Sequence, residues 1–103
     1  MTMLDLIVRE FISIVQAFEK ETDAENNRII AERDIFKKLL EKNAFATFRR
    51  KIKIYKDLNF IIHDSESYTM PYKDKDLGKT VRKVIINYKA YETIKQLYTT
   101  NVK

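Results

Sequence analysis

The feature that most constrains this chain is one amphipathic, strongly basic stretch between residues 43 and 59. Its large apolar residues recur at steps of three or four, which places them on one face of an α-helix: Phe45, Phe48, Ile52, Tyr55 and Leu58. A turn of about 100° per residue brings polar and small residues to the other side. The opposite face is expected to carry Ala46, Arg50 and Lys53, with Thr47 and Ile54 beside them and Arg49 and Lys56 on the flanks of the apolar stripe.

The outward side of this helix is almost entirely of one sign. Five cations lie in the stretch, against a single acid, Asp57. A charged outer face is usually only a solvated one. A face rich in Arg, carried by the second helix of a pair, is more typical of contact with phosphate. We therefore expect it to face nucleic acid, with plain solvation as the alternative.

Charge is distributed unevenly along the 103 residues. The whole chain carries a net charge of +5. Residues 1–36 hold eight acids and four bases, a net of −4, whereas residues 37–103 hold sixteen bases and seven acids, a net of +9. The positive field belongs to the later part of the chain, where a polyanion is expected to dock.

The first helix is expected to begin after Thr2, a suitable N-cap, and to end near Glu21. Its apolar surface is wider than one stripe, because Leu6 and Ile12 extend it. One small core rarely needs both sides of a helix, so we expect the excess to cover a second copy of the chain; a deeply buried helix is the alternative. The expected dimer interface consists of Leu4, Phe11, Phe18, Tyr91 and Tyr98.

A second helix is expected just before the basic one. Residues 22–27 are polar and predict a loop, residues 28–31 predict a short strand, and residues 32–42 predict a helix. The apolar residues expected to face inward on this helix are Ile35, Phe36, Leu39 and Leu40. Only Asn43 and Ala44 then separate it from the basic helix, which is the spacing of a helix-turn-helix.

The end of the chain predicts a hairpin and a last helix. Asn59 stands where the basic helix must stop, and Asn is second to Gly in the left-handed conformation that ends helices. Residues 60–63 and 81–86 predict two strands, joined by a long polar tip over residues 64–80. Asn87 is a suitable N-cap for a final helix, which we expect to pack against the first.

This order of elements resembles the winged helix-turn-helix family of DNA-binding domains over nearly the whole chain. Residues 29–40 are similar to its strand and positioning helix, and residues 45–58 to its recognition helix. The run Leu58-Asn59-Phe60-Ile61 is similar to the family's helix exit, and Lys79-Thr80-Val81-Arg82 to the basic return strand of its wing. The resemblance implies an α+β fold in a single domain, residues 1–103: a three-helix core with a β-hairpin wing and a C-terminal helix.

The expected contacts with double-stranded DNA fall into three groups. Arg50 and Lys53, with Thr47, are expected to face the groove, where Arg pairs bidentately with guanine. A second group is expected near phosphates: Arg49, Lys51, Lys56, Lys37 and Lys38. The hairpin tip offers a third group: Tyr68, Tyr72, Lys73, Lys75 and Lys79. A mobile, solvated tip and tyrosines that stack on single-stranded bases are the alternatives for this last group.

The sequence argues against catalysis and against bound cofactors. His63 is the only histidine and cysteine is absent, so neither a transition-metal site nor a disulfide is expected. Gly78-Lys79-Thr80 imitates the end of a P-loop, but Lys73 occupies the position where that loop needs its first Gly. No signal peptide or membrane-spanning run is evident, which favours the cytoplasm.

Three functions agree with these expectations. The chain is similar to small accessory proteins of the relaxosome, the complex that assembles at the transfer origin of clostridial conjugative plasmids, because it is dense in Lys, Ile and Asn and carries no effector domain. Such a protein would bind DNA as a homodimer and contact a relaxase or another transfer protein. A small transcriptional regulator has the same chemistry at a promoter. A winged-helix module that binds proteins is the third reading.

Overall fold

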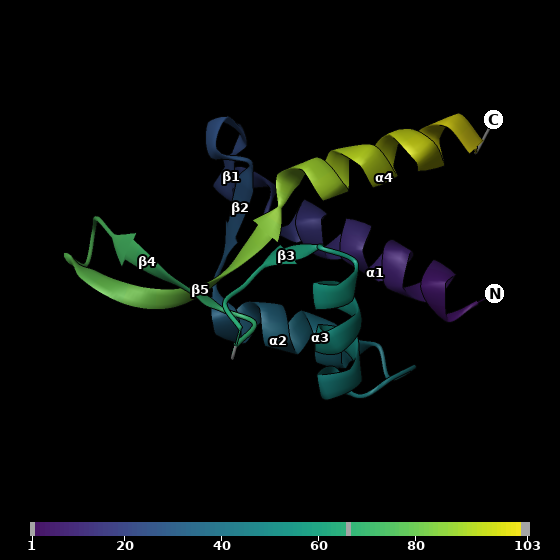
Figure 1. Ribbon diagram of the computed structural model, residues 1–103, viewed down its shortest axis with the longest axis horizontal. Coiled ribbons are helices and arrows are strands. Elements are labelled where there is room, and N and C mark those ends of the chain that lie inside the picture. The colour runs from purple at the N-terminus through teal and green to yellow at the C-terminus, as the bar shows by residue number, and fades with distance from the viewer. Residues whose placement is uncertain (1, 66, 102–103) are drawn as a thin grey trace.

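The computed structural model describes the backbone of residues 2–65 and 67–101, and the side chains of these residues up to Leu97 (Figure 1). The described residues form four α-helices: α1 (Met3–Ala17), α2 (Arg33–Lys42), α3 (Phe48–Asp57) and α4 (Tyr88–Asn101). They also form two 3-10 turns, η1 (Glu19–Glu21) and η2 (Ala24–Asn26), and five strands: β1 (Thr22–Asp23), β2 (Arg28–Ala31), β3 (Ile61–Ile62), β4 (Met70–Asp74) and β5 (Lys79–Asn87). The expected α+β class is confirmed.

Strand β5 organises the sheet. Its second half pairs antiparallel with β2 and with β3, so that Ile86 has Ile29 as its partner in β2 and Ile61 as its partner in β3. Strand β1 extends the sheet beyond β2, which gives the order β1-β2-β5-β3. The first half of β5 pairs only with β4 among the described strands, and the two form a hairpin over residues 70–83, which Figure 1 shows projecting from the body of the molecule.

The core lies where the sheet meets the helices. Phe11 of α1 stacks on Phe60 with ring centroids 4.1 Å apart, and it meets the edges of Tyr55 and Tyr91 at 5.9 and 6.4 Å. Side chains of this size contribute most of the apolar area that a small domain buries. As expected, α4 packs along α1, and both free ends of this helix pair lie at the same end of the molecule (Figure 1).

Several element boundaries agree with local capping chemistry. Thr2 and Asp5 form a capping box at the start of α1. Strand β2 covers residues 28–31 as predicted. Asn59 has φ 57°, the left-handed conformation expected at the exit of α3. Asn87 caps α4, because its side-chain oxygen accepts a hydrogen bond from the backbone N–H of Ala90.

Other boundaries differ from the prediction. Helix α1 ends at Ala17 rather than near Glu21, and residues 22–27 hold β1 and η2 rather than a plain loop. Helix α3 begins only at Phe48, because the Thr47 hydroxyl caps it by accepting from the Arg50 N–H; the turn after α2 is therefore longer than two residues. The expected irregular tip over residues 64–80 holds β4 and the start of β5; the described residues before Met70 stay irregular, and residues 75–78 form the turn, with Gly78 at φ +66°.

Two apolar side chains lie differently from the predicted faces. Ile35, expected to face inward, is 51% exposed, because the buried stripe of α2 runs through Phe36 and Leu40 instead. Ile54, expected among the outward charges of α3, is half-buried and packs against the core. Within the described residues, no helix is both long and apolar enough to cross a bilayer.

Candidate nucleic-acid interface

The exposed side of α3 carries a compact group of cations. Arg49, Arg50 and Lys53 are all exposed, and Lys53 lies one turn after the consecutive pair Arg49 and Arg50, on the same side of the helix. The side chain of Lys53 is 77% exposed and forms an ion pair with Asp57 at 3.0 Å. Lys56, at the edge of this face, is half-buried. We call Arg49, Arg50 and Lys53 the basic face of α3.

Helix α2 contributes a cation next to the start of α3. The Nζ of Lys37 lies over the ring of Phe48, 5.5 Å from its centroid. Phe48 is the first residue of α3, so this contact places Lys37 beside the turn that carries Arg49 and Arg50. Lys37 and Lys38 are both exposed. Of the expected phosphate contacts, the lysine next to the basic face is therefore Lys37.

Tyr68 is also brought to Phe48. Its ring meets the edge of Phe48 at a centroid distance of 5.4 Å and lies 6.5 Å from Phe36. Desolvation by burial raises the pKa of the Tyr68 hydroxyl. Tyr68 was expected at a free tip, but it is packed half-buried against α2 and α3, so its ring is not free to stack on an unpaired base.

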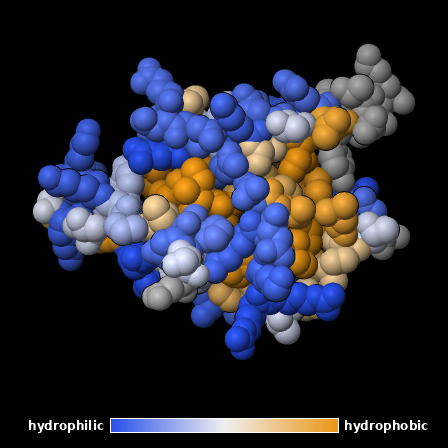
Figure 2. All heavy atoms as spheres, viewed as in Figure 1, coloured by the Kyte–Doolittle hydropathy of each residue, from blue (hydrophilic) through white to orange (hydrophobic). Residues whose placement is uncertain are grey.

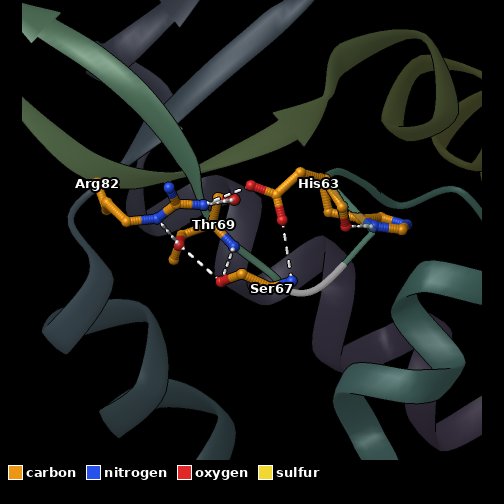
Figure 3. Close-up of polar contacts among 5 residues, drawn as sticks. His63, Ser67, Thr69 and Arg82 are labelled. Atoms are coloured by element: carbon orange, nitrogen blue, oxygen red, sulfur yellow. Dashed lines mark hydrogen bonds and ion pairs between the residues drawn. The ribbon is translucent and has the colours of Figure 1, made fainter.

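A polar clip fixes the segment that carries Tyr68 (Figure 3). Arg82 of β5 donates to the Oδ2 of Asp64 at 2.7 Å, and to the hydroxyl and the carbonyl of Thr69 at 2.8 Å each. Ser67 donates its backbone N–H to Asp64 and shares a 2.9 Å hydrogen bond with the Thr69 hydroxyl. Arg82, expected in a basic return strand, is therefore used within the fold to hold this segment.

The hairpin separates residues that the sequence analysis grouped together. Side chains on a strand alternate between two faces, and residues paired across strands share a face. Tyr72 therefore shares its face with its partner Val81, and Lys73 shares the other face with Thr80. The ring of Tyr72 lies under Arg28 of β2, 5.6 Å away, on the body side of the hairpin. One flat ligand cannot meet both Tyr72 and Lys73.

The charges at the tip of the hairpin are mixed. Lys79 lies opposite Asp74 in the register of the hairpin. Lys75 and Asp74 line a cleft of about 840 Å³ between the hairpin, η1 and the start of α2. Tyr72 and Ile35 also line it, with four further acids, Glu19, Glu21, Glu32 and Asp76, and two further lysines, Lys20 and Lys83. Lys73, Lys75 and Lys79 are all exposed, but only Lys73 lies on the face turned away from this acidic cleft.

Lys51 contradicts the expected phosphate contact. Its side chain is fully buried and forms an ion pair with Glu10 of α1 at 2.6 Å. Tyr55 donates its hydroxyl hydrogen to the same carboxylate at 2.9 Å. Burial, with the charge of Glu10, raises the pKa of the Tyr55 hydroxyl well above its ordinary value, so it remains a donor. Sequence reasoning counted Lys51 among the surface cations and overlooked Glu10.

The spacing in the sequence carried a signal for this pair. Lys51 stands three residues after Phe48 and four before Tyr55, which is a position on the apolar stripe of α3. Glu10 stands three residues after Ile7 and four before Ile14, on the apolar stripe of α1. A base on one stripe and an acid on another are the pattern that a buried ion pair leaves in a sequence.

The residues expected at a dimer interface differ in their burial. Phe11, Phe18 and Tyr91 are buried within the single chain, so they fill its own core. Leu4 is 56% exposed, and the side chain of Tyr98 lies outside the described part of the structure. Leu97 of α4, which was not among the expected interface residues, is 57% exposed.

The surface view shows where polar and apolar residues gather on one face of the molecule. Figure 2 shows hydrophilic residues over the front of α3 and over the hairpin, and apolar residues gathered between α4 and α3. Among the described residues, no group of three or more His, Cys, Asp or Glu side chains is arranged to hold a metal ion.

Comparison with protein-family models and with curated proteins returned no match.

Proposed function

We propose that this protein is a winged helix-turn-helix domain that binds double-stranded DNA through the basic face of α3. The observation that carries the proposal is the presence of three exposed cations, Arg49, Arg50 and Lys53, on one face of the second helix of an α2–turn–α3 unit. A helix of this kind fits the major groove, which admits an α-helix. The order of helices, the three-strand pairing through β5 and the projecting hairpin support the winged-helix assignment.

The roles of the cations follow from their places on the helix. Arg50 has the length and the planar donors to pair with the O6 and N7 atoms of guanine, which gives sequence selectivity. Lys37 and Lys38 of α2 and Arg49 at the edge of the face suit phosphates, which give affinity without selectivity. The ion pair between Lys53 and Asp57 is exposed, so it opens at little cost when a phosphate or a base edge approaches.

The hairpin contributes less than the sequence analysis expected. Lys73 is free to reach the DNA backbone, because it lies on the outer face of β4. Tyr72 is engaged with Arg28, and Lys75 belongs to the acidic cleft. We therefore assign the larger share of binding to α3 and α2.

A second copy of the chain completes the proposed assembly. Leu4, near the start of α1, and Leu97, near the end of α4, are both exposed, and these ends of the two helices lie at the same end of the molecule (Figure 1). Two copies joined there by a two-fold axis would present two α3 helices to two half-sites of DNA. Sedimentation at micromolar concentration tests this: a dimer that Leu4→Glu with Leu97→Glu converts to monomer agrees, and a wild-type monomer excludes it.

The biological setting that we propose is an accessory protein at a plasmid transfer origin, where it would assist a relaxase. A small transcriptional regulator is the alternative with the same chemistry. A footprint on the DNA around the gene distinguishes them: protection at a transfer origin favours the first, and protection at a promoter favours the second.

A protein-binding role is the second candidate function. The cleft between the hairpin and η1 favours it, because Ile35 offers an exposed apolar contact at its wall. Binding to a random duplex, followed by fluorescence anisotropy at about 50 and 200 mM salt, tests the two candidates, since phosphate contacts lose affinity steeply over this range. No binding at low salt would leave only the protein-binding role.

A further inference from the structure

A fully buried cation connects the three helices α1, α2 and α3. The Nζ of Lys51 lies 2.6 Å from the Oε2 of Glu10. The same Nζ donates to the backbone carbonyl of Leu40 at 2.6 Å and to the backbone carbonyl of Asn43. The ring of Phe45 covers it, with its centroid 4.1 Å from the Nζ. The ammonium group is thus surrounded by three oxygen atoms and one aromatic ring, and it has no contact with solvent.

The two carbonyls explain why a lysine is needed at this place. The last carbonyls of a helix have no donor within that helix. Many helices satisfy them with a Gly in the left-handed conformation, but the residue after α2 is Asn43, which is extended at φ −104° and ψ 111°. Lys51 supplies the donors from α3, at the negative end of the α2 dipole. The turn over residues 43–47 is therefore closed by the helix that follows it.

The carboxylate of Glu10 holds α3 at a second point. Its Oε2 meets Lys51, and its Oε1 accepts the hydrogen bond of Tyr55, one helical turn further on. Two directional contacts one turn apart restrict the rotation of α3 about its own axis more closely than burial of its apolar stripe does alone. Arg50 and Lys53 face away from this carboxylate, so their direction depends on it.

We propose that Lys51 is a positioning residue: with Glu10 and Tyr55 it closes the turn between α2 and α3 and sets the direction in which the basic face of α3 points. The effect of Lys51 on DNA binding rests on the proposed function, whereas its effect on the turn between α2 and α3 does not. Replacement of a buried ion pair by well-packed apolar residues often preserves stability, so stability and positioning are separable by experiment.

The test compares three proteins by hydrogen exchange of the backbone amides. The triple variant Glu10→Leu, Lys51→Met, Tyr55→Phe removes both charges and the tyrosine hydroxyl together, so that no charge is left buried alone; the side chain of Asn43, which donates to Glu10 at 3.5 Å, is unchanged. The matched control is Lys53→Met, which removes a cation two residues away on the exposed face. We expect amides of residues 43–50 to exchange about tenfold faster or more in the triple variant and at the wild-type rate in the control.

The second part of the test measures DNA binding. It uses a duplex that the wild-type protein selects from a pool of random sequences. We expect the triple variant to prefer this duplex over random DNA about tenfold less than wild type does, with an unchanged salt slope, because its phosphate contacts remain. Lys53→Met is expected to lower affinity and the salt slope without faster exchange in the turn.

Wild-type exchange at residues 43–50 in the triple variant would overturn the proposal, whatever the protein does with DNA. Faster exchange in the turn with no binding of any duplex would uphold the positioning role and reject the proposed function. If the triple variant does not fold, Tyr55→Phe alone decides: it removes one of the two contacts with Glu10, and exchange in the turn that stays at the wild-type rate overturns the proposal.

Discussion

Lys51 and Lys53 stand two residues apart on the same helix and have opposite surroundings. Lys51 is fully buried against Glu10, whereas the side chain of Lys53 is 77% exposed beside Asp57. Two residues correspond to a rotation of about 200°, which carries a side chain from one side of a helix to the other. The same residue type therefore holds the fold together on one side and is available to a ligand on the other.

This contrast shows how to interpret a basic helix. The number of cations on α3 does not measure the charge that it presents, because one of them is neutralised inside the protein. The charge available to DNA depends on which cations lie outside the apolar stripe. Two comparisons between a buried and a more exposed side chain test this, and two further predictions concern the cations that face DNA and the cap of α2; all four are given in order of expected size.

The largest effect is expected at Lys51. The change Lys51→Met leaves the Glu10 carboxylate buried without its cation, so we expect unfolding free energy to fall by about 3–5 kcal/mol. The change Lys53→Met breaks only an exposed ion pair, so we expect a loss of about 0.5 kcal/mol or less. Urea unfolding monitored by circular dichroism measures both. Equal losses would contradict the division of α3 into two sides.

The next effect is expected at Tyr55. The change Tyr55→Phe removes a buried hydrogen bond to a carboxylate, and we expect a loss of about 1.5–3 kcal/mol. The change Tyr72→Phe on the hairpin is the matched control, because that ring is half-buried and its hydroxyl forms no hydrogen bond with another described residue. Thermal unfolding of both variants gives the comparison. A loss as large at Tyr72 would mean that the contact with Glu10 is not special.

The third effect concerns binding. We expect Arg50→Ala to cost about 1–3 kcal/mol on the preferred duplex and to relax selectivity at one base pair. We expect Lys38→Ala to weaken binding to all duplexes alike and to lower the salt slope by about one. Fluorescence anisotropy over a salt series separates the two. Equal losses that ignore sequence would place Arg50 at a phosphate and not at a base.

The smallest effect is expected at Glu32, which caps α2. Hydrogen bonds from the backbone N–H groups of Ile35 and Asp34 lower the pKa of Glu32 below its ordinary value of 4.5. Because the unfolded chain binds the proton at higher pH, the carboxylate stabilises the fold above about pH 4.5, and this contribution is lost as the pH falls through the folded-state pKa. We expect Glu32→Gln to cost about 0.5–1 kcal/mol at neutral pH and less near pH 3.

Unfolding curves of wild type and Glu32→Gln at several pH values measure that difference. A gap between the two proteins that stays constant from pH 7 to about pH 3 would show that the carboxylate charge is not what caps the helix.

Local chemistry made much of the fold predictable. Asn59 and Asn87 mark the exit of α3 and the start of α4 because their side chains and backbone preferences act within a few residues. Strand β2 was found from its short apolar run. These features depend on residues only a few positions away, so they can be predicted without knowledge of the tertiary structure.

The packing of α4 on α1 was predicted, but side-chain contacts between residues distant in the sequence were not. The sequence places Lys51 on a basic helix, but only the packing of α1 against α3 shows that Glu10 neutralises it, 41 residues away along the chain. In the same way, the pairing of β4 with β5 separates Tyr72 from Lys73, and the contact with Phe48 removes Tyr68 from the tip. The role of each of these side chains depends more on its partners in the folded chain than on its residue type.

The central claim is that the exposed side of α3 binds double-stranded DNA, and amide chemical shifts in the ¹⁵N-labelled protein test it most directly. On addition of a duplex of about 20 base pairs at low salt, we expect shifts concentrated at residues 47–57 and at Lys37 and Lys38, abolished together by Arg50→Ala with Lys53→Ala. Shifts confined to the cleft around Ile35 and Lys75, or no shifts, would contradict it.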